Sequence, residues 1–364
     1  MNIHFIEYWA AVRLLLDGAN PYSPADLLAR QQRLGWTDTA PLVMWNPPWT
    51  MAFTLPFGLV SYETGHFLWF LLNTLLIFVG AHVLERIYGR DGQKSRAWLA
   101  ALVFAPTYLV LLLGQIGPLV LFGVIGFLFF IKKRAWVLSG ASLVLVSIKP
   151  HLLYLLWFAL LLWMWRGRRW QVALGLASAG VIGALIPVIF DSAIYSQYLQ
   201  LFSASGMVRP SDWATPSLGI ALGRFFDISQ ISLRWAPALM GVIWFIWYWA
   251  RHAETWDWVD QLPLVLLVSL VTTGFAWTYD QIVLLPAVIQ ASAWSARDEI
   301  KPRRNILIAM FVALSVAVLI LKLRFQNDFL YFWLAPAYLI FYLHLRQQVS
   351  ASRAAKKTGD MSAI

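Results

Sequence analysis

The run WQVALGLASAGVIGALIPVIF, residues 170–190, decides the fold class of this chain. It contains no charged residue, and it is long enough to cross the hydrocarbon core of a bilayer as one helix, which takes roughly 20 residues. Arg166, Arg168 and Arg169 stand directly before the run, and Asp191 follows it. The pattern therefore predicts a membrane-spanning helix with a strongly basic flank at one end only.

Similar apolar stretches occupy most of the remaining chain. Of its 364 residues, 60% are hydrophobic and only 13% are charged, and the mean hydropathy is +0.65, which lies outside the usage of soluble globular proteins. We therefore expect an all-α polytopic membrane protein with about eleven transmembrane helices, several of them short enough to be broken or re-entrant. The predicted spans are 65–86, 97–113, 117–131, 135–148, 151–165, 170–190, 232–250, 262–276, 279–296, 305–322 and 329–345.

Lys and Arg gather in the links on one side of these predicted spans. Because such links face the cytoplasm, we expect a multi-pass plasma-membrane protein with a cytoplasmic C-terminus. The net charge of +10 is then explained by the links and the tail, and not by a nucleic-acid partner. The basic residues of the links are Arg86, Arg90, Lys94 and Arg96, then Lys132, Lys133 and Arg134, then Arg166, Arg168 and Arg169, then Arg251, then Arg297, Lys301, Arg303 and Arg304, and finally those of the tail 346–357.

The links of the opposite side carry polar and proline-containing motifs. They are Gly114–Pro118, Ser147–His151, the long segment 191–215 and Trp277–Gln281. Since several loops of one face can converge on one site, we expect the active site to face the outside of the membrane.

Residues 1–64 differ from the rest. Phe5, Tyr8 and Trp9 share a face of an amphipathic helix, which is typical of an element lying on a bilayer surface. The short apolar stretch 43–60 either crosses the membrane or re-enters on the outer side, and we favour re-entry. We thus expect outer-face amphipathic and re-entrant helices in 1–64, a transmembrane domain in 65–346 and a disordered cytoplasmic tail in 347–364.

A series of short motifs follows in a specific order. They are His4-Phe5-Ile6-Glu7-Tyr8-Trp9, Gly18-Ala19-Asn20-Pro21-Tyr22, Asn46-Pro47-Pro48, Leu55-Pro56, Gly114-Gln115-Ile116-Gly117-Pro118 and Ile148-Lys149-Pro150-His151. With them, about the first 300 residues resemble glycosyltransferase family 87, a branch of the integral-membrane GT-C enzymes related to polyprenol-phosphate-mannose-dependent mannosyltransferases. The resemblance implies a GT-C-type helix bundle that moves a hexose, with mannose the leading candidate, from a polyprenyl-phosphate donor to a glycolipid or glycan of the cell envelope, with inversion.

The chain departs from this family at its start. The family pattern opens with Asp-Phe at the outer end of a first transmembrane helix, and that Asp is the expected catalytic base. Here His4 takes its place, and no transmembrane helix precedes it. Either a helix with the usual carboxylate lies upstream, or the chain lacks both.

Transfer from a lipid-linked sugar phosphate needs a base for the acceptor hydroxyl and a cation for the leaving phosphate. Glu7 and His4 can share a helix face, and either could be the base, although Glu7 could also be a solvated charge. Lys149 and His151 are the candidates for phosphate binding, and the alternative is that they anchor the chain at the interface. Gln115 stands where helix ends expose N–H groups that favour anions, or it belongs to a plain turn.

Five further residues are candidates for substrate binding: Tyr8, Asn46, Tyr279, Asp280 and Arg209. An ionisable group such as Asp280 at the end of an apolar run suggests a functional site, although it could equally cap the next helix. Arg209 lies with Asp212 and Trp213 in the long outer segment, which could recognise the acceptor or merely cover the site. Arg224 and Arg234 are further outer-face cations with possible lipid-phosphate contacts.

Several classes of site are excluded or unsupported. The chain has no Cys, which excludes disulfides and thiolate chemistry. Paired acidic ligands for Mg²⁺ and a nucleotide-phosphate loop are absent from the sequence, so we expect no metal and no cofactor. Two rivals stay open: a transporter or flippase of lipid-linked substrates, which should show inverted repeats that we do not find, and a catalytically silent GT-C homologue, which the substitution by His4 favours.

Overall fold

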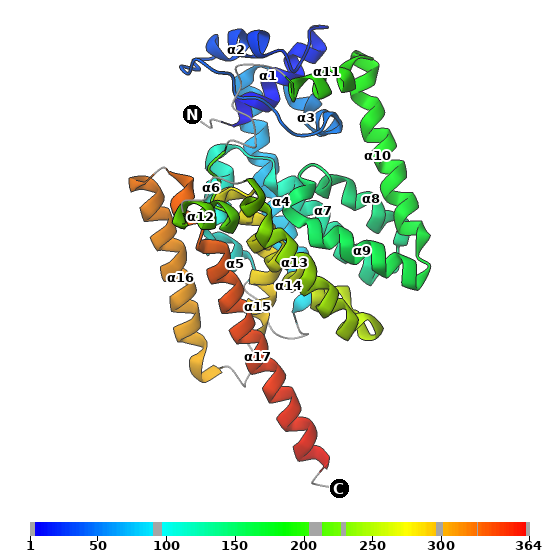
Figure 1. Ribbon diagram of the computed structural model, residues 1–364, viewed down its shortest axis with the longest axis vertical. Helices are drawn as coiled ribbons and strands as arrows, with labels where there is room; N and C mark the ends of the chain where they lie inside the picture. Colours follow the sequence, from blue (N-terminus) through cyan, green and yellow to red (C-terminus); the bar gives the residue numbers. More distant parts are fainter. Residues whose placement is uncertain are drawn as a thin grey trace. The chain divides into compact units, whose positions relative to one another are not determined.

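The computed structural model describes residues 4–89, 97–203, 213–226, 231–295, 301–325 and 327–361. Within these ranges the chain is built of α-helices and short 3-10 helices, with no β-strand (Figure 1). The all-α prediction is therefore confirmed.

Within the described residues, four helical stretches are long and apolar enough to cross a membrane. They are α4 (Tyr62–Tyr88), α10 (Trp170–Phe190), the part Arg304–Arg324 of α16 (Lys301–Arg324), and Asp328–Ala351, which joins the 3-10 helix η6 (Asp328–Tyr331) to α17 (Leu334–Met361). Shorter apolar helices are α7 (Gly117–Lys132), α8 (Trp136–Val146) and α14 (Trp258–Thr272). The chain is thus a membrane protein, and the number of crossings stays a prediction.

Several predicted spans are interrupted. The stretch 97–113 is two helices, α5 (Ala97–Val103) and α6 (Ala105–Leu113), because Pro106 has no N–H for a continuous helix. The hydroxyl of Thr107 donates to the carbonyl oxygen of Ala101 over 2.8 Å and satisfies a group that the break exposes. Two other spans begin as 3-10 helices: η2 (Pro150–Leu153) leads into α9 (Tyr154–Gly167), and η5 (Thr278–Leu284) leads into α15 (Leu285–Ser295).

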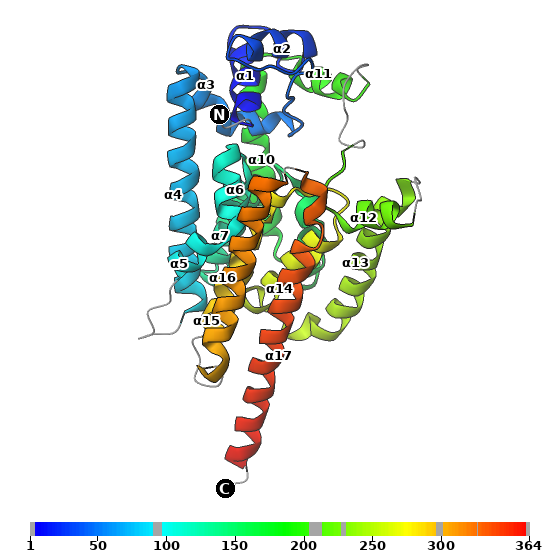
Figure 2. The ribbon, with the colours of Figure 1, turned by 90° about the vertical axis from the view of Figure 1, so that its left-hand side faces the viewer.

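The chain forms two units that are interleaved in the sequence. The first comprises Met1–Leu76, Val110–Pro150 and Arg168–Trp213, and the second comprises Ile77–Leu109, His151–Gly167 and Ala214–Ile364. In the first unit, α1 (Phe5–Leu16), α2 (Pro24–Gln32), η1 (Pro48–Thr50), α3 (Met51–Gly58) and α11 (Ile194–Leu201) lie together in both views (Figures 1 and 2). α3 has 8 residues, too few to cross a bilayer alone, and re-entry of the stretch 43–60 stays a prediction.

The membrane helices of the first unit pack through small residues. α8 lies between α7 and α10, and the contact between α8 and α10 is made by two glycines. A Cβ atom at Gly140 would stand 1.9 Å from the carbonyl oxygen of Val172, and one at Gly175 would stand 1.9 Å from that of Val137. Such reciprocal gaps let helix backbones approach closely, as is common in membranes.

The second unit is organised around α14. This helix is buried along nearly its whole length and packs against α9, α13 (Ile231–His252), α15 and α17. A polar network ties three of these helices together: Arg346 donates to the hydroxyl oxygen of Tyr248 over 3.0 Å and to Oε1 of Gln261 over 3.1 Å. The unit also holds α12 (Leu218–Phe225) and η4 (Ala253–Thr255). α17 continues to Met361, past the residue at which the sequence predicts that order ends.

Candidate active site

Helix α1 is buried on almost every side. Ten of its 12 residues are buried, among them the polar Glu7 and Tyr8. The amphipathic pattern predicted an element lying on the bilayer surface, and that location stays a prediction. Aromatic rings from α4 cover the helix: Tyr62 packs on Phe5 and Trp9, and the ring of Trp69 lies 5.7 Å from that of Tyr8.

Gln115 joins two of the predicted site residues. Its Oε1 accepts a hydrogen bond from the hydroxyl of Tyr8 over 3.1 Å and another from Nζ of Lys149 over 3.2 Å. All three side chains are buried, and Lys149 is 9% exposed. The three residues come from α1, from the turn before α7 and from the turn between α8 and η2, so one amide connects three segments of the first unit.

The turn that carries Gln115 is fixed by its backbone. Gly114 has a φ of +66°, a left-handed conformation that glycine adopts without strain. The carbonyl oxygen of Gly114 accepts a hydrogen bond from Nε1 of Trp69 over 2.8 Å, and the N–H of Gln115 donates to the carbonyl oxygen of Val110 over 3.0 Å. The glycines of this motif therefore hold the amide in place.

The segment before Lys149 is held by the Asn-Pro-Pro-Trp motif. Nδ2 of Asn46 donates to the carbonyl oxygen of Ile148 over 3.3 Å, and Nε1 of Trp49 donates to the hydroxyl of Ser147 over 3.1 Å. Asn46 thus touches the residue next to Lys149, and we assign it to the support of the candidate site.

His4 and Glu7 occupy the start of α1. Nδ1 of His4 and Oε2 of Glu7 lie 3.9 Å apart, and the His4 side chain is 24% exposed against 10% for that of Glu7. The N–H of His4 donates to the carbonyl oxygen of Leu113 over 3.0 Å. Since residues 4, 7 and 8 are neighbours on one helix face, the first unit combines a carboxylate, an imidazole and a lysine around the turn 113–115.

Aromatic rings surround the residue before Asn46. The Trp45 ring makes edge contacts with Phe202 at 5.7 Å and with Trp213 at 6.4 Å, and its carbonyl oxygen accepts a hydrogen bond from the hydroxyl of Tyr198 over 3.1 Å. Tyr198 packs on Tyr22 at 5.3 Å. Burial raises the pKa of Tyr22 well above its ordinary value, and Tyr198 and Tyr195 add to the rise. The sequence pattern placed Trp213 in the segment that could recognise the acceptor, but it gave no signal for Trp45, Tyr198 or Phe202.

Five of the predicted residues belong to the second unit: His151, Arg224, Arg234, Tyr279 and Asp280. The carbonyl oxygen of His151 accepts a hydrogen bond from Thr273 over 2.9 Å, and its ring meets Phe275 edge-on at 6.4 Å. The buried Arg234 lies 4.5 Å above the same Phe275 ring. Tyr279 is buried, at 6% exposure. The substrate and phosphate roles predicted for His151 and Tyr279 stay predictions.

Asp280 caps its own helix. Its Oδ2 accepts a hydrogen bond from the N–H of Trp277 over 2.9 Å, which is the capping alternative that the sequence left open. The neighbouring Thr278 donates through its N–H and its hydroxyl to the carboxylate of Asp328, over 3.3 and 3.0 Å, and Lys322 pairs with that carboxylate. Sequence reasoning missed Asp328 and Lys322. Arg209 and Asp212 lie outside the described residues.

No group of three or more His, Asp or Glu residues that could hold a metal ion is found in the part of the chain that the structure describes.

Comparison with known proteins gives one match. The chain matches no curated protein and no solved structure. A sequence model of glycosyltransferase family 87 matches residues 45–275, which is more than half of the chain and includes Asn46, Gln115, Lys149 and His151. The chain therefore belongs to glycosyltransferase family 87 and is a membrane glycosyltransferase.

Proposed function

We propose that this protein transfers a hexose, mannose first among the candidates, from a polyprenyl-phosphate donor to a hydroxyl of an envelope glycolipid or glycan. The observation that carries the proposal is the convergence of Tyr8 and Lys149 on Gln115, because it brings a buried cation together with the segment of α1 that holds Glu7. Family membership supports the glycosyl transfer itself.

Lys149 is assigned to the leaving group. When the bond between the anomeric carbon and the phosphate oxygen breaks, negative charge grows on the phosphate, and a fixed ammonium in a water-poor site stabilises it strongly. Lys149 is buried, which strengthens this electrostatic interaction. Gln115 positions the ammonium through the contact of 3.2 Å.

Glu7 is assigned to the proton transfer. The acceptor oxygen attacks the anomeric carbon from the side opposite the phosphate, its bond to carbon forms as the carbon–phosphate oxygen bond breaks, and its proton passes to the Glu7 carboxylate. His4, at 3.9 Å from that carboxylate, orients it and is the alternative base. Inversion of the anomeric centre follows from a single displacement.

The acceptor is assigned to the aromatic cluster around Trp45. The face of an aromatic ring is electronegative and attracts the weakly positive C–H groups of a sugar ring. Trp45 precedes Asn46, whose amide contacts Ile148 beside Lys149. A sugar bound at this cluster would therefore lie next to the candidate site. The basic links on the other side of the predicted spans support an outward-facing site in the plasma membrane.

Radiolabel transfer in membranes tests the proposal. Membranes containing the protein receive polyprenyl-phosphate-linked mannose or glucose, and label in the acceptor fraction is compared between wild type, Lys149→Ala and the control Lys133→Ala. Lys133 is exposed and lies over the Phe129 ring, outside the site. We expect transfer by wild type and by the control, and none by Lys149→Ala at equal protein levels. Equal transfer by all three would remove Lys149 from the site.

One alternative has support of its own. His4 stands where the family carries its expected catalytic Asp, so a protein that binds lipid phosphate without turnover is the second candidate. Binding of donor by wild type without any transfer, with either sugar, would favour it.

A further inference from the structure

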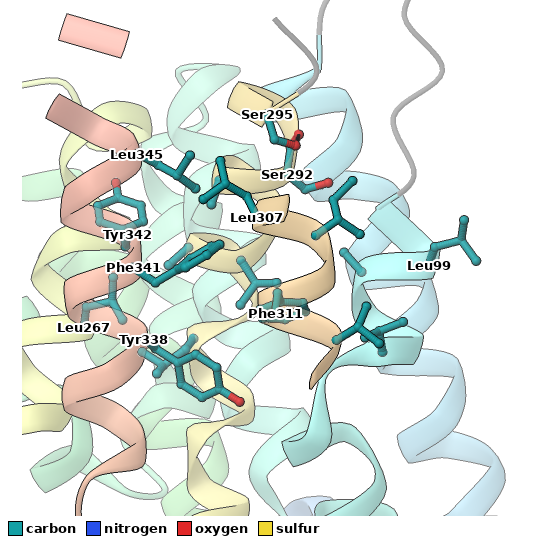
Figure 3. A pocket seen from close by; sticks show the side chains of 18 residues that line it. Leu99, Leu267, Ser292, Ser295, Leu307, Phe311, Tyr338, Phe341, Tyr342 and Leu345 are labelled. Atoms are coloured by element: carbon teal, nitrogen blue, oxygen red, sulfur yellow. Dashed lines mark hydrogen bonds between the residues drawn. The ribbon is translucent and has the colours of Figure 1, made fainter. Parts of the chain in front are cut away.

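The second unit encloses an apolar cavity of about 260 Å³. Its walls come from α5, α14, α15, α16 and α17, and Figure 3 shows the side chains that line it. An enclosed water needs only roughly 10–15 Å³ but also needs polar partners, and apolar cavities stay dry and accept apolar ligands. The size and lining therefore favour a hydrocarbon chain over water.

The two ends of the cavity differ in character. Ser292 and Ser295 lie together at one end, and Phe311 and Tyr338 lie toward the other (Figure 3). Phe104 packs behind the aromatic end, with its ring stacked on that of Phe311 at 6.3 Å.

Cations stand at the serine end. On α16, Arg304 precedes the lining residues Leu307 and Ile308 by one turn, so it shares their helix face. Arg346 follows the lining residue Leu345 on α17 and is held by Tyr248 and Gln261. The positive charge is therefore at the end where the headgroup of an inserted lipid would lie.

The cavity also reaches the lipid-facing side of the unit. Ile308 lines it and is 45% exposed, and the neighbouring Ile306 and Met310 of α16 are exposed apolar residues. A membrane lipid could therefore enter sideways from the bilayer without passing through water.

We propose that this cavity binds one acyl chain of an anionic phospholipid, with the phosphate at Arg304. The lipid belongs to the bilayer leaflet at the serine end, and it is a structural lipid distinct from the sugar donor. Binding to the folded protein alone would raise its stability with the logarithm of the lipid concentration once that concentration exceeds the Kd.

The test uses the purified full chain in detergent with phosphatidylglycerol, or with phosphatidylcholine of the same acyl chains. Lipid retention is measured by native mass spectrometry and stability by thermal unfolding. We expect several-fold more phosphatidylglycerol than phosphatidylcholine on wild type, together with a higher Tm in phosphatidylglycerol. Equal retention of both lipids by wild type would overturn the proposal.

Four variants locate the lipid. Ala287→Phe fills the cavity from α15, and Ala291→Leu does so with a smaller side chain if the first does not fold. Val316→Phe adds the same ring at an exposed position of α16 that does not line the cavity. We expect retention to be lost in the filled variants, kept in Val316→Phe, and no longer selective for phosphatidylglycerol in Arg304→Gln. Retention by a folded, filled variant, or displacement by an equal amount of polyprenyl phosphate, would contradict the assignment.

Discussion

Tyr8 and Lys149, far apart in the sequence, donate to the same oxygen atom, Oε1 of Gln115. A neutral amide that accepts from a phenol and an ammonium fixes the orientation of both. Because all three side chains are buried, the loss of one partner leaves polar atoms without the hydrogen bond that water would otherwise supply. The geometry predicts that the three residues act as a unit.

The coupling of Tyr8 to Gln115 can be measured. We expect Tyr8→Phe to lower the free energy of unfolding by about 1 kcal/mol, the net value of one buried hydrogen bond. Transfer should fall less than in the Lys149 variants, since the cation remains. A double-mutant cycle combines Tyr8→Phe with Gln115→Leu and is measured by thermal unfolding in detergent and by initial transfer rates. The loss in the double variant should be smaller than the sum of the losses in the two single variants. Strict additivity would contradict a shared network.

Lys149 should contribute to the chemical step and not to substrate binding alone. Removing one preorganised charge stabiliser typically lowers kcat by about 10²–10³-fold. We expect a loss of this size in Lys149→Met, which keeps the length of the side chain, with donor KM changed far less. Lys133→Met is the matched control, because Lys133 is exposed. A variant with a raised donor KM and an unchanged kcat would show that Lys149 binds substrate and transition state equally.

The sequence predicted the helical class, the membrane location and the motifs that meet in the first unit. Tyr8, Asn46, Gln115 and Lys149 all belong to one connected set of hydrogen bonds and adjacent residues. The motifs of Asn46, Gln115 and Lys149 each contain the glycine or proline at which a helix begins: Pro48, Gly117 and Pro150.

Other features could not be predicted, for physical reasons. Apolar periodicity on α1 marks the residues that avoid water, and it does not show that Tyr62 and Trp69 cover the helix. Asp280 follows an apolar run in the same way whether it binds a ligand or caps a helix. The bond to Trp277 shows the cap, and substrate binding by Asp280 stays a prediction. The aromatic cluster at Trp45 arises from tertiary packing between distant segments and leaves no local pattern.

The contact between α8 and α10 gives a stability prediction. Gly140 leaves no room for a side chain, since a Cβ would stand 1.9 Å from a backbone carbonyl oxygen, whereas a Cβ at Gly180 of α10 meets nothing within 4 Å. We expect Gly140→Ala to cost about 1–3 kcal/mol by overpacking. Gly180→Ala should be neutral or stabilising by up to about 1 kcal/mol through helix propensity. Thermal unfolding of both variants in detergent measures the difference, and equal stabilities would contradict the close approach.

The roles of Glu7 and His4 separate by substitution. Glu7→Gln keeps the shape of the side chain and removes the base, so we expect kcat to fall by about 10²–10⁴-fold with normal expression. The kcat of His4→Gln should fall less than that of Glu7→Gln, because the imidazole only orients the carboxylate. Transfer rates across pH, measured in membranes for both variants, decide between them. The opposite order, with His4→Gln the more damaged, would make His4 the base.

Trp45 provides the test of the acceptor. If a sugar ring lies against the aromatic cluster, Trp45→Ala should raise the KM for the acceptor about tenfold or more, the effect of roughly 1.4 kcal/mol of lost binding, and leave the KM for the donor unchanged. Trp45→Phe keeps a ring face and should restore most of the affinity for the acceptor. A purely structural role of the indole would not require this recovery. Trp165, 72% exposed and in the second unit, gives the control variant Trp165→Ala, which should change neither constant. Equal rises of both KM values in Trp45→Ala would indicate that the cluster holds the fold of the site and does not select the acceptor. A selective rise would show that the rings before Asn46 bind the sugar that receives the hexose.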